Sequence, residues 1–280
     1  MSRDRMQASR FELKYLVTED VAQRVRDFVL CYLNMDENSV GKPNFSYPVH
    51  SLYLDSKALD LYWRTINGDK NRFKLRVRYY NDKPGTPIFF EIKRRMKDII
   101  QKQRGGVHHH SVPKILAGYF PEPSDLVSNN PKGNAAIQQF QTLMTRLQAA
   151  PMTHIFYMRE AYVSDNDEVR VTMDRSVLIE PNPSGKIKTQ MTNPVHAYRD
   201  FVILELKFTD RFPNWFRELV RVADSMQTGA AKYVSGINLL GHRALGVPEA
   251  VLEQESLLSA PHPGDDLPVH GRERTPFPRW

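Results

Sequence analysis

The stretch RFELKYLV, Arg10–Val17, places a charged side chain at every second position and an apolar side chain between them. Successive side chains of a β-strand point to opposite faces, so the Arg, Glu and Lys of this stretch share one face and its apolar residues share the other. The tripeptide Glu-x-Lys returns in FFEIKRR (residues 89–95) and in VILELKF (residues 202–208). The sequence therefore predicts at least three strands that each carry a charged face and an apolar face.

Composition predicts a globular chain with an anionic partner. The chain has 280 residues, of which 41% are hydrophobic, and a formal net charge of +7. No apolar run approaches the roughly 20 residues that cross a bilayer, and the N-terminal residues lack the apolar core of a signal peptide. We expect no membrane span and a cytoplasmic location. The charge alone leaves nucleic acid, a phosphate-rich ligand and a membrane surface open as partners.

Periodicity along the chain predicts an α+β fold. Three strand candidates follow one another closely between residues 71 and 107, which indicates an antiparallel meander, and further strands lie between residues 150 and 209. A helical insertion is expected at about residues 111–150. We predict tails at residues 1–9 and 246–280 and one folded domain at residues 10–245. The aromatic residues recur at helix and strand spacing, which favours the core over stacking on bases.

The charged strand faces raise the question of where they point. Their residues are Arg10, Glu12, Lys14, Lys74, Arg76, Arg78, Glu91, Lys93, Lys102, Arg104, Arg159, Arg170, Asp174, Glu205 and Lys207. A solvated outer face is the usual position of such residues. Arg and Lys dominate here, however, and so many cations facing one another repel unless a polyanion lies among them. A closed antiparallel barrel of about eight strands, with helices packed outside, has a lumen wide enough for a small ligand.

Several of these segments, in their order along the chain, carry a family resemblance. The segments RFELKY, SLYLDSKALDLYWRTI, FKLRVRYY, FFEIKRR, YMREAYV, VRVTMDRS, VILELKF and KYVSGINLL resemble the VTC domain, the polyphosphate polymerase domain of the vacuolar transporter chaperone complex. That domain belongs to the triphosphate tunnel metalloenzyme (CYTH-like) superfamily. The resemblance covers about residues 10–245. It implies an antiparallel tunnel barrel, ATP and polyphosphate as partners, a Mn²⁺ or Mg²⁺ ion as cofactor, and synthesis of polyphosphate with release of ADP.

The resemblance also implies which residues form the site. The expected catalytic phosphate ligands are Lys14, Arg64, Arg76, Arg78, Lys93, Arg159, Arg170, Lys207 and Lys232. Tyr157 and Ser235 are expected to contact the substrate, as are Lys102 and Arg104 on the charged face of their strand. Glu205 matches the metal-binding glutamate. Glu12 and Glu91 are left with two alternatives, a second metal ligand or a partner of a neighbouring cation, and we favour pairing.

One departure from the superfamily pattern bears on the reaction. Hydrolytic members typically begin with Glu-x-Glu-x-Lys, whereas Arg10 replaces the first acid here. This substitution favours the polymerase over a tunnel triphosphatase that hydrolyses inorganic or organic triphosphate. A non-catalytic polyphosphate or inositol-phosphate binding module is a third hypothesis. We expect no nucleic-acid partner, because the cations lie along strand faces and not on a basic helix or an aromatic platform. The sequence leaves the oligomeric state open.

Overall fold

The computed structural model describes residues 10–97, 99–209, 211–224, 227 and 229–248. The predicted tail at residues 1–9 and all but the first residues of the tail predicted from residue 246 lie outside the described residues. Val247 is buried among apolar residues, so the packed structure extends at least this far. Within the described part of the chain, none of the helices is long and apolar enough to span a membrane.

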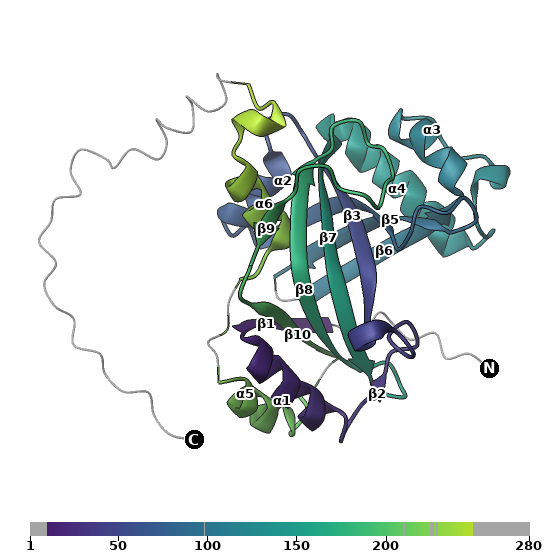
Figure 1. Cartoon of the computed structure of the whole chain (residues 1–280). Helices are drawn as coiled ribbons and strands as arrows, with labels where there is room; N and C mark the ends of the chain where they lie inside the picture. Colours follow the sequence, from purple (N-terminus) through teal and green to yellow (C-terminus); the bar gives the residue numbers. More distant parts are fainter. Residues whose placement is uncertain (1–9, 98, 210, 225–226, 228, 249–280) are drawn as a thin grey trace, which may run out of the picture.

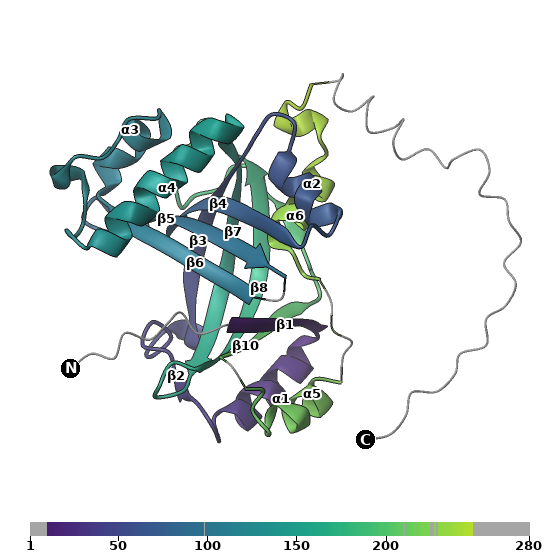
Figure 2. The same ribbon diagram turned by 180° about the vertical axis from the view of Figure 1, so that it is seen from behind.

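The strands confirm the predicted α+β fold with a large antiparallel, tunnel-like sheet. Ten strands pair in the order β2-β7-β3-β4-β5-β6-β1-β10-β8-β9, and β7 also pairs with β8. Their bounds are β1 Arg10–Val17, β2 Asn34–Met35, β3 Ser46–Asp55, β4 Asn71–Tyr79, β5 Ile88–Met96, β6 Ile99–Val107, β7 Ala150–Val163, β8 Val169–Pro181, β9 Val195–Ala197 and β10 Val202–Thr209. The long strands β7 and β8 lie side by side, and β4, β5 and β6 cross behind them (Figures 1 and 2).

The pairing of β7 with β8 joins the two arms of the sheet into a circuit of eight strands, whereas β2 and β9 extend it at the edges. One seam of this circuit is narrow. β1 pairs with β10 along its whole length, but it meets β6 at the single register pair Arg10–Ile100. The strands are therefore paired around most of the circuit, but β1 and β6 are not paired along their length.

Helices cover the outer, apolar faces of the strands. The helices are α1 Glu19–Val29, α2 Asp60–Ile66, α3 Val112–Leu116, α4 Pro131–Leu147, α5 Phe216–Ala223 and α6 Lys232–Leu240. Helix α4 packs across β5 and β6 (Figure 2). In this contact Phe140 meets Phe90 edge to face, with 5.0 Å between ring centroids. Helices α1 and α5 pack together beside β1 and β10. Because the apolar faces are buried outward under helices, the charged faces turn inward.

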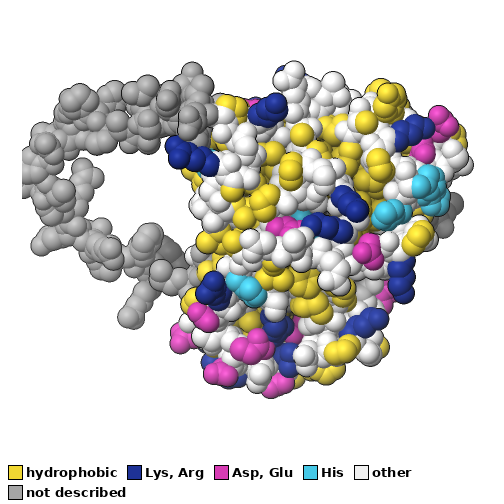
Figure 3. Space-filling view, turned by 45° about the horizontal axis from the view of Figure 1, so that its top comes forward, with side chains coloured by type: hydrophobic (Ala, Val, Ile, Leu, Met, Phe, Trp, Pro, Cys, Tyr) yellow, Lys and Arg dark blue, Asp and Glu magenta, His cyan; other side chains and the backbone are white. Residues whose placement is uncertain are grey.

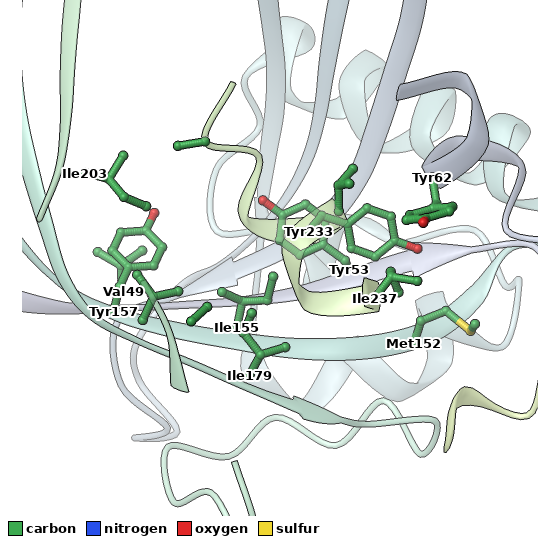
Figure 4. Packing of buried hydrophobic residues seen from close by; sticks show 14 of the residues in the cluster. Val49, Tyr53, Tyr62, Met152, Ile155, Tyr157, Ile179, Ile203, Tyr233 and Ile237 are labelled. Atoms are coloured by element: carbon green, nitrogen blue, oxygen red, sulfur yellow. The ribbon is translucent and has the colours of Figure 1, made fainter. Parts of the chain in front are cut away.

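Helices α2 and α6 cover the remaining end of the sheet. The buried carboxylate of Asp55 accepts hydrogen bonds from the backbone N–H groups of Leu61 and Tyr62, at 2.9 and 3.0 Å, and so satisfies donors in the first turn of α2. It also accepts a 2.7 Å bond from the hydroxyl of Tyr233 on α6. The rings of Tyr233 and Tyr53 stack 5.0 Å apart within this cluster (Figure 4). Asp55 therefore fixes the start of α6, which carries Lys232, against the sheet.

The sequence predicts a helix from Thr18 to about Leu33 that would bury the thiol of Cys31. The structure differs, because α1 ends at Val29 and Cys31 is exposed just beyond it. The helix stops early because Leu30, Cys31 and Tyr32 form a turn whose N–H groups bond to carbonyls of the last helical turn.

Candidate active site

The inner faces of the strands enclose one large cavity of about 1930 Å³. Fourteen Lys and Arg residues line it, against six Asp and Glu residues, within the part of the chain that the structure describes. The basic residues are Lys14, Arg72, Lys74, Arg76, Arg78, Lys93, Arg94, Arg95, Lys102, Arg104, Arg159, Arg170, Lys207 and Lys232. On the outer face seen in Figure 3, by contrast, Lys and Arg lie dispersed among acidic and apolar side chains. The interior is thus a concentrated field of positive charge.

Glu205 lies at the centre of a cluster of cations. Its carboxylate is 4% exposed and lies 3.1 Å from the Nζ of Lys14, 2.5 Å from that of Lys207 and 3.4 Å from that of Lys232. The guanidinium of Arg159 is 3.7 Å away. Burial alone would raise the pKa of Glu205, but these cations, Lys14 foremost, hold it well below its usual value. Glu205 is therefore ionised and holds four basic side chains together.

Asp174 supports the same cluster from β8. Its buried carboxylate receives a forked pair of hydrogen bonds from Arg159, at 2.6 and 2.7 Å, and an ion pair from Lys232 at 2.6 Å. Arg159 and Lys232 also flank the ring of Tyr157, with 5.1 and 4.7 Å from each charged group to the ring centroid. A bidentate fork fixes a guanidinium in one orientation. Asp174 thus positions two cations for a ligand in the cavity.

Glu12 and Glu91 pair with cations, as favoured from the sequence. Glu12 accepts from Lys93 at 2.9 Å and lies 3.1 Å from Lys14. Glu91, fully buried on β5, lies 2.6 Å from a terminal nitrogen of Arg76 and accepts from its Nε at 2.7 Å. Burial opposes the effect, yet the neighbouring cations hold the pKa of both carboxyls far below the usual range. Each acid cancels part of the charge of the cavity wall.

Other cations in the wall lack a carboxylate partner among the described residues. Arg78 donates to the hydroxyl of Tyr157 at 2.9 Å and to the hydroxyl of Ser51, both neutral acceptors. The Nζ of Lys74 lies 6.0 Å from the ring centroid of Tyr233 and interacts with the phenol of Tyr53. In the sheet register Lys74 faces Lys93, which faces Lys102, so three lysines form a row across β4, β5 and β6. Like charges placed opposite one another destabilise a sheet, which an anion among them would relieve.

The proton affinities of these groups reflect this excess of positive charge. Burial and the cations around it lower the pKa of Lys102 to about 7, although Glu91 opposes the effect. Burial and the cations Lys14, Lys93 and Arg72 lower the pKa of Lys74 to about 8. Burial alone would raise the pKa of the Tyr53 phenol, but Arg76 and Lys74 lower it to about 7. The cavity therefore carries less positive charge near neutral pH than its number of basic residues suggests.

Most of the residues predicted from the sequence come together in this cavity. Lys14, Arg76, Arg78, Lys93, Lys102, Arg104, Tyr157, Arg159, Arg170, Glu205, Lys207 and Lys232 all line it. The structure does not bring Arg64 or Ser235 to the wall. Arg64 lies on α2, and the hydroxyl of Ser235 on α6 is hydrogen-bonded to that of Tyr198.

The ligands predicted from the sequence omit Lys74, Asp174 and Tyr53, although Lys74 and Asp174 are among the predicted charged strand faces. Lys74 shares the inward face of β4 with Arg76 and Arg78, so the alternation that identified those two residues identifies Lys74 as well. Asp174 had a place on a charged face, but its role as the counter-ion of Arg159 required the pairing of β7 with β8. Tyr53 gave no signal, because its neighbours along the strand are apolar.

The donor set around Glu205 fits a divalent cation only in part. No group of three or more His, Cys, Asp or Glu side chains suited to a metal is present in the described ranges. Mg²⁺ is commonly bound by one or two carboxylates together with the phosphate oxygens of a substrate. The buried Glu205 carboxylate suits such an ion once phosphates occupy the surrounding lysines. These residues therefore fit a metal that binds together with phosphate oxygens.

Comparison with known proteins gives a family and several distant structural neighbours. The sequence model of the VTC domain family matches residues 9–241. A protein from Pyrococcus horikoshii OT3 is 11% identical over 82% of this chain and 98% of its own, with a TM-score of 0.42. A candidate adenylate cyclase from Bacillus halodurans is 10% identical over 80% of this chain and 94% of its own, with a TM-score of 0.45. A conserved protein from Pyrococcus furiosus is 9% identical over 78% and 92%, with a TM-score of 0.38.

Proposed function

This chain belongs to the VTC domain family, and on that premise we propose that it is a metal-dependent polyphosphate polymerase. It transfers the γ-phosphate of ATP to the end of a polyphosphate chain inside the basic cavity and releases ADP. The observation that carries the proposal is a pair of cations in the wall, Lys74 and Arg78, that have no carboxylate partner among the described residues. Holding such cations together costs electrostatic free energy, which a linear polyanion bound among them would offset.

Phosphoryl transfer requires the protein mainly to position the reacting groups and to stabilise negative charge. A terminal phosphate oxygen of the polymer forms a bond to the γ-phosphorus of ATP, and the bond from that phosphorus to the bridging β,γ-oxygen breaks as ADP leaves. The attacking oxygen is already ionised near neutral pH, so the reaction requires no general base. The charge that spreads over the equatorial oxygens is stabilised by Arg and Lys groups that are fixed beforehand. The wall supplies such groups without a Ser, Cys or His nucleophile.

Each cluster of the wall takes part in this scheme. Arg159, held by Asp174, and Lys232 would contact the oxygens of the transferred phosphoryl group, and Arg78 would bind an adjacent phosphate. When bound, Mn²⁺ or Mg²⁺ would neutralise charge on the donor phosphates, and Glu205 is the residue that would hold it. Lys14 and Lys207 would then transfer part of their interaction from Glu205 to phosphate oxygens.

The test is a synthesis assay with matched variants. Purified protein is incubated with ATP and Mn²⁺, and polymer is separated from free phosphate on a gel while ADP is measured. Arg78→Ala is expected to lower polymer synthesis by at least about 100-fold, the usual effect of removing one fixed donor to a charged transition state. Glu205→Gln is expected to abolish metal-dependent synthesis. Glu218→Gln and Arg221→Ala, which remove an exposed ion pair on α5, are the controls and should synthesise normally.

The products separate the proposal from the other hypotheses. Polymer together with ADP, lost in Arg78→Ala and Glu205→Gln but not in the controls, would support the polymerase. Release of free phosphate without polymer would replace it with a triphosphatase. Tight triphosphate binding without either product, persisting in EDTA, would replace it with a binding module.

A further inference from the structure

One end of the cavity brings three aromatic side chains together beside cations. Tyr47 lies at the start of β3, Tyr80 directly follows β4, and Phe89 lies at the start of β5. Their ring centroids are 6.2 Å apart between Tyr47 and Tyr80 and 6.5 Å apart between Tyr80 and Phe89. The guanidinium of Arg104 lies 4.5 Å from the centroid of Phe89. We call these four residues the aromatic end.

The register of the sheet places the aromatic end directly beside the cations of the site. Phe89 is the register partner of Arg78, and Tyr47 is the register partner of Arg159. A ligand whose phosphates contact Arg78 and Arg159 would thus have its next chemical group among the three rings. Because the strands β3, β4 and β5 are continuous here, this relation is set by the rigid part of the fold.

The rings retain free binding capacity. Neither the hydroxyl of Tyr47 nor that of Tyr80 makes a hydrogen bond within the described part of the chain, although both residues line the cavity. Tyr80 and Phe89 are only partly buried. Rings packed for stability alone are usually fully covered, with their hydroxyls satisfied. Here the ring of Tyr47 is largely buried, whereas the rings of Tyr80 and Phe89 are partly exposed along the cavity.

Inorganic polyphosphate offers nothing that such rings recognise, since it has no apolar surface and no π-face. A nucleobase has both, together with polar edges that a tyrosine hydroxyl can meet, and bases stack on aromatic side chains and on guanidinium planes. We propose that the aromatic end is a nucleoside subsite that binds the base of a nucleoside triphosphate whose phosphates lie among Arg78 and Arg159. The proposal rests on the proposed function in that the donor is a nucleotide.

The experiment compares two ligands that differ only in the nucleoside. Calorimetric titrations of the full chain in EDTA measure the Kd of ATP and that of inorganic tripolyphosphate. Phe89→Leu keeps apolar volume but removes the ring, and Tyr80→Phe keeps the ring but removes the hydroxyl. Phe89→Leu is expected to weaken ATP binding about tenfold, within the range for one stacked base, with tripolyphosphate binding unchanged. Tyr80→Phe is expected to weaken ATP binding less, again selectively.

The matched control is Phe120→Leu, the same truncation at an exposed ring outside the cavity; it should change the Kd of neither ligand. The subsite is overturned if Phe89→Leu leaves the ratio of the two Kd values unchanged, whether both ligands weaken or neither does. It is also overturned if the wild type binds tripolyphosphate but not ATP. Because both titrations measure binding without turnover, a protein that makes no polymer would refute the polymerase while leaving this comparison decisive.

Discussion

Binding of ATP at pH 8 is expected to draw protons into the cavity. At that pH a lysine with a pKa of about 7, such as Lys102, carries about 0.1 proton, and Lys74, with a pKa of about 8, carries about half. Phosphate oxygens beside them would restore the ordinary lysine pKa near 10.4, so both become fully protonated. These two residues alone take up about 1.4 protons. The logarithm of the association constant for ATP therefore falls by at least about 1.4 per pH unit as the pH rises through 8.

Calorimetry in buffers of different ionisation enthalpy measures this uptake as a slope of heat against buffer enthalpy. ATP suits the experiment because its terminal phosphate, with a pKa near 6, is already ionised at pH 8, and EDTA removes metal. Arginine remains protonated throughout. Lys102→Arg should therefore reduce the uptake by about 0.9 proton and Lys74→Arg by about 0.5.

The differences between variants form the test, because other groups in the cavity, Tyr53 and Lys207 among them, add to the total uptake. Lys114→Arg is the control, since Lys114 lies outside the cavity and pairs with Glu122, and its slope should match the wild type. A wild-type heat that does not depend on the buffer would refute the reasoning. So would Arg substitutions at Lys74 and Lys102 that leave the slope unchanged.

Three further predictions concern stability. Burial lowers the pKa of His50 and His154 to about 4, so the unfolded chain takes up protons before the folded chain does as the pH falls below about 6.5. In urea unfolding, the free energy of unfolding should therefore fall by about 2 kcal/mol per histidine between pH 7 and 5. This loss should be absent in the double variant with Gln at both positions. Gly105→Ala, whose added Cβ would lie 2.3 Å from a carbonyl oxygen of α4, should lower the free energy of unfolding by about 1–3 kcal/mol, whereas Gly85→Ala, with open space around it, should not. Asp174→Asn should lower the melting temperature without ligand, because Arg159 and Lys232 lose their nearer counter-ion and keep only the more distant Glu205. Tripolyphosphate should raise the melting temperature of this variant more than that of the wild type; equal shifts would contradict the pairing.

The strands and the direction of their charged faces were accessible from the sequence because alternation is a local signal. Arg76 and Arg78 share a face whatever the rest of the chain does, and an excess of like charge argues for an interior that holds an anion. The pairing of β1 with β10 is not accessible in this way. Alternation assigns a residue to a face but gives no distance to a residue far along the chain, and Lys14 lies opposite Glu205 only because β1 pairs with β10.

The misplaced residues follow from the same limit. Arg64 and Ser235 lie on helices, where a motif match does not determine which side of the helix meets the cavity. Apart from Tyr157, the sequence assigns the tyrosines to the core, because strand spacing does not distinguish a fully buried ring, such as Tyr79, from one that also lines the cavity, such as Tyr47. The exposed fraction of a ring depends on what covers the strand, and that is a property of the whole barrel.

The pairing of β1 with β10 has a consequence for folding during synthesis on the ribosome. Arg10 lies opposite Thr209 in the register, so the first strand waits for a partner almost 200 residues away. At about 5–20 residues per second of synthesis, that delay is roughly 10–40 s. An unpaired strand of eight residues is exposed to edge-to-edge aggregation for that time, and charged side chains are a common protection against it. Glu12 and Lys14 would thus protect the nascent chain from aggregation before the cavity that they line has formed.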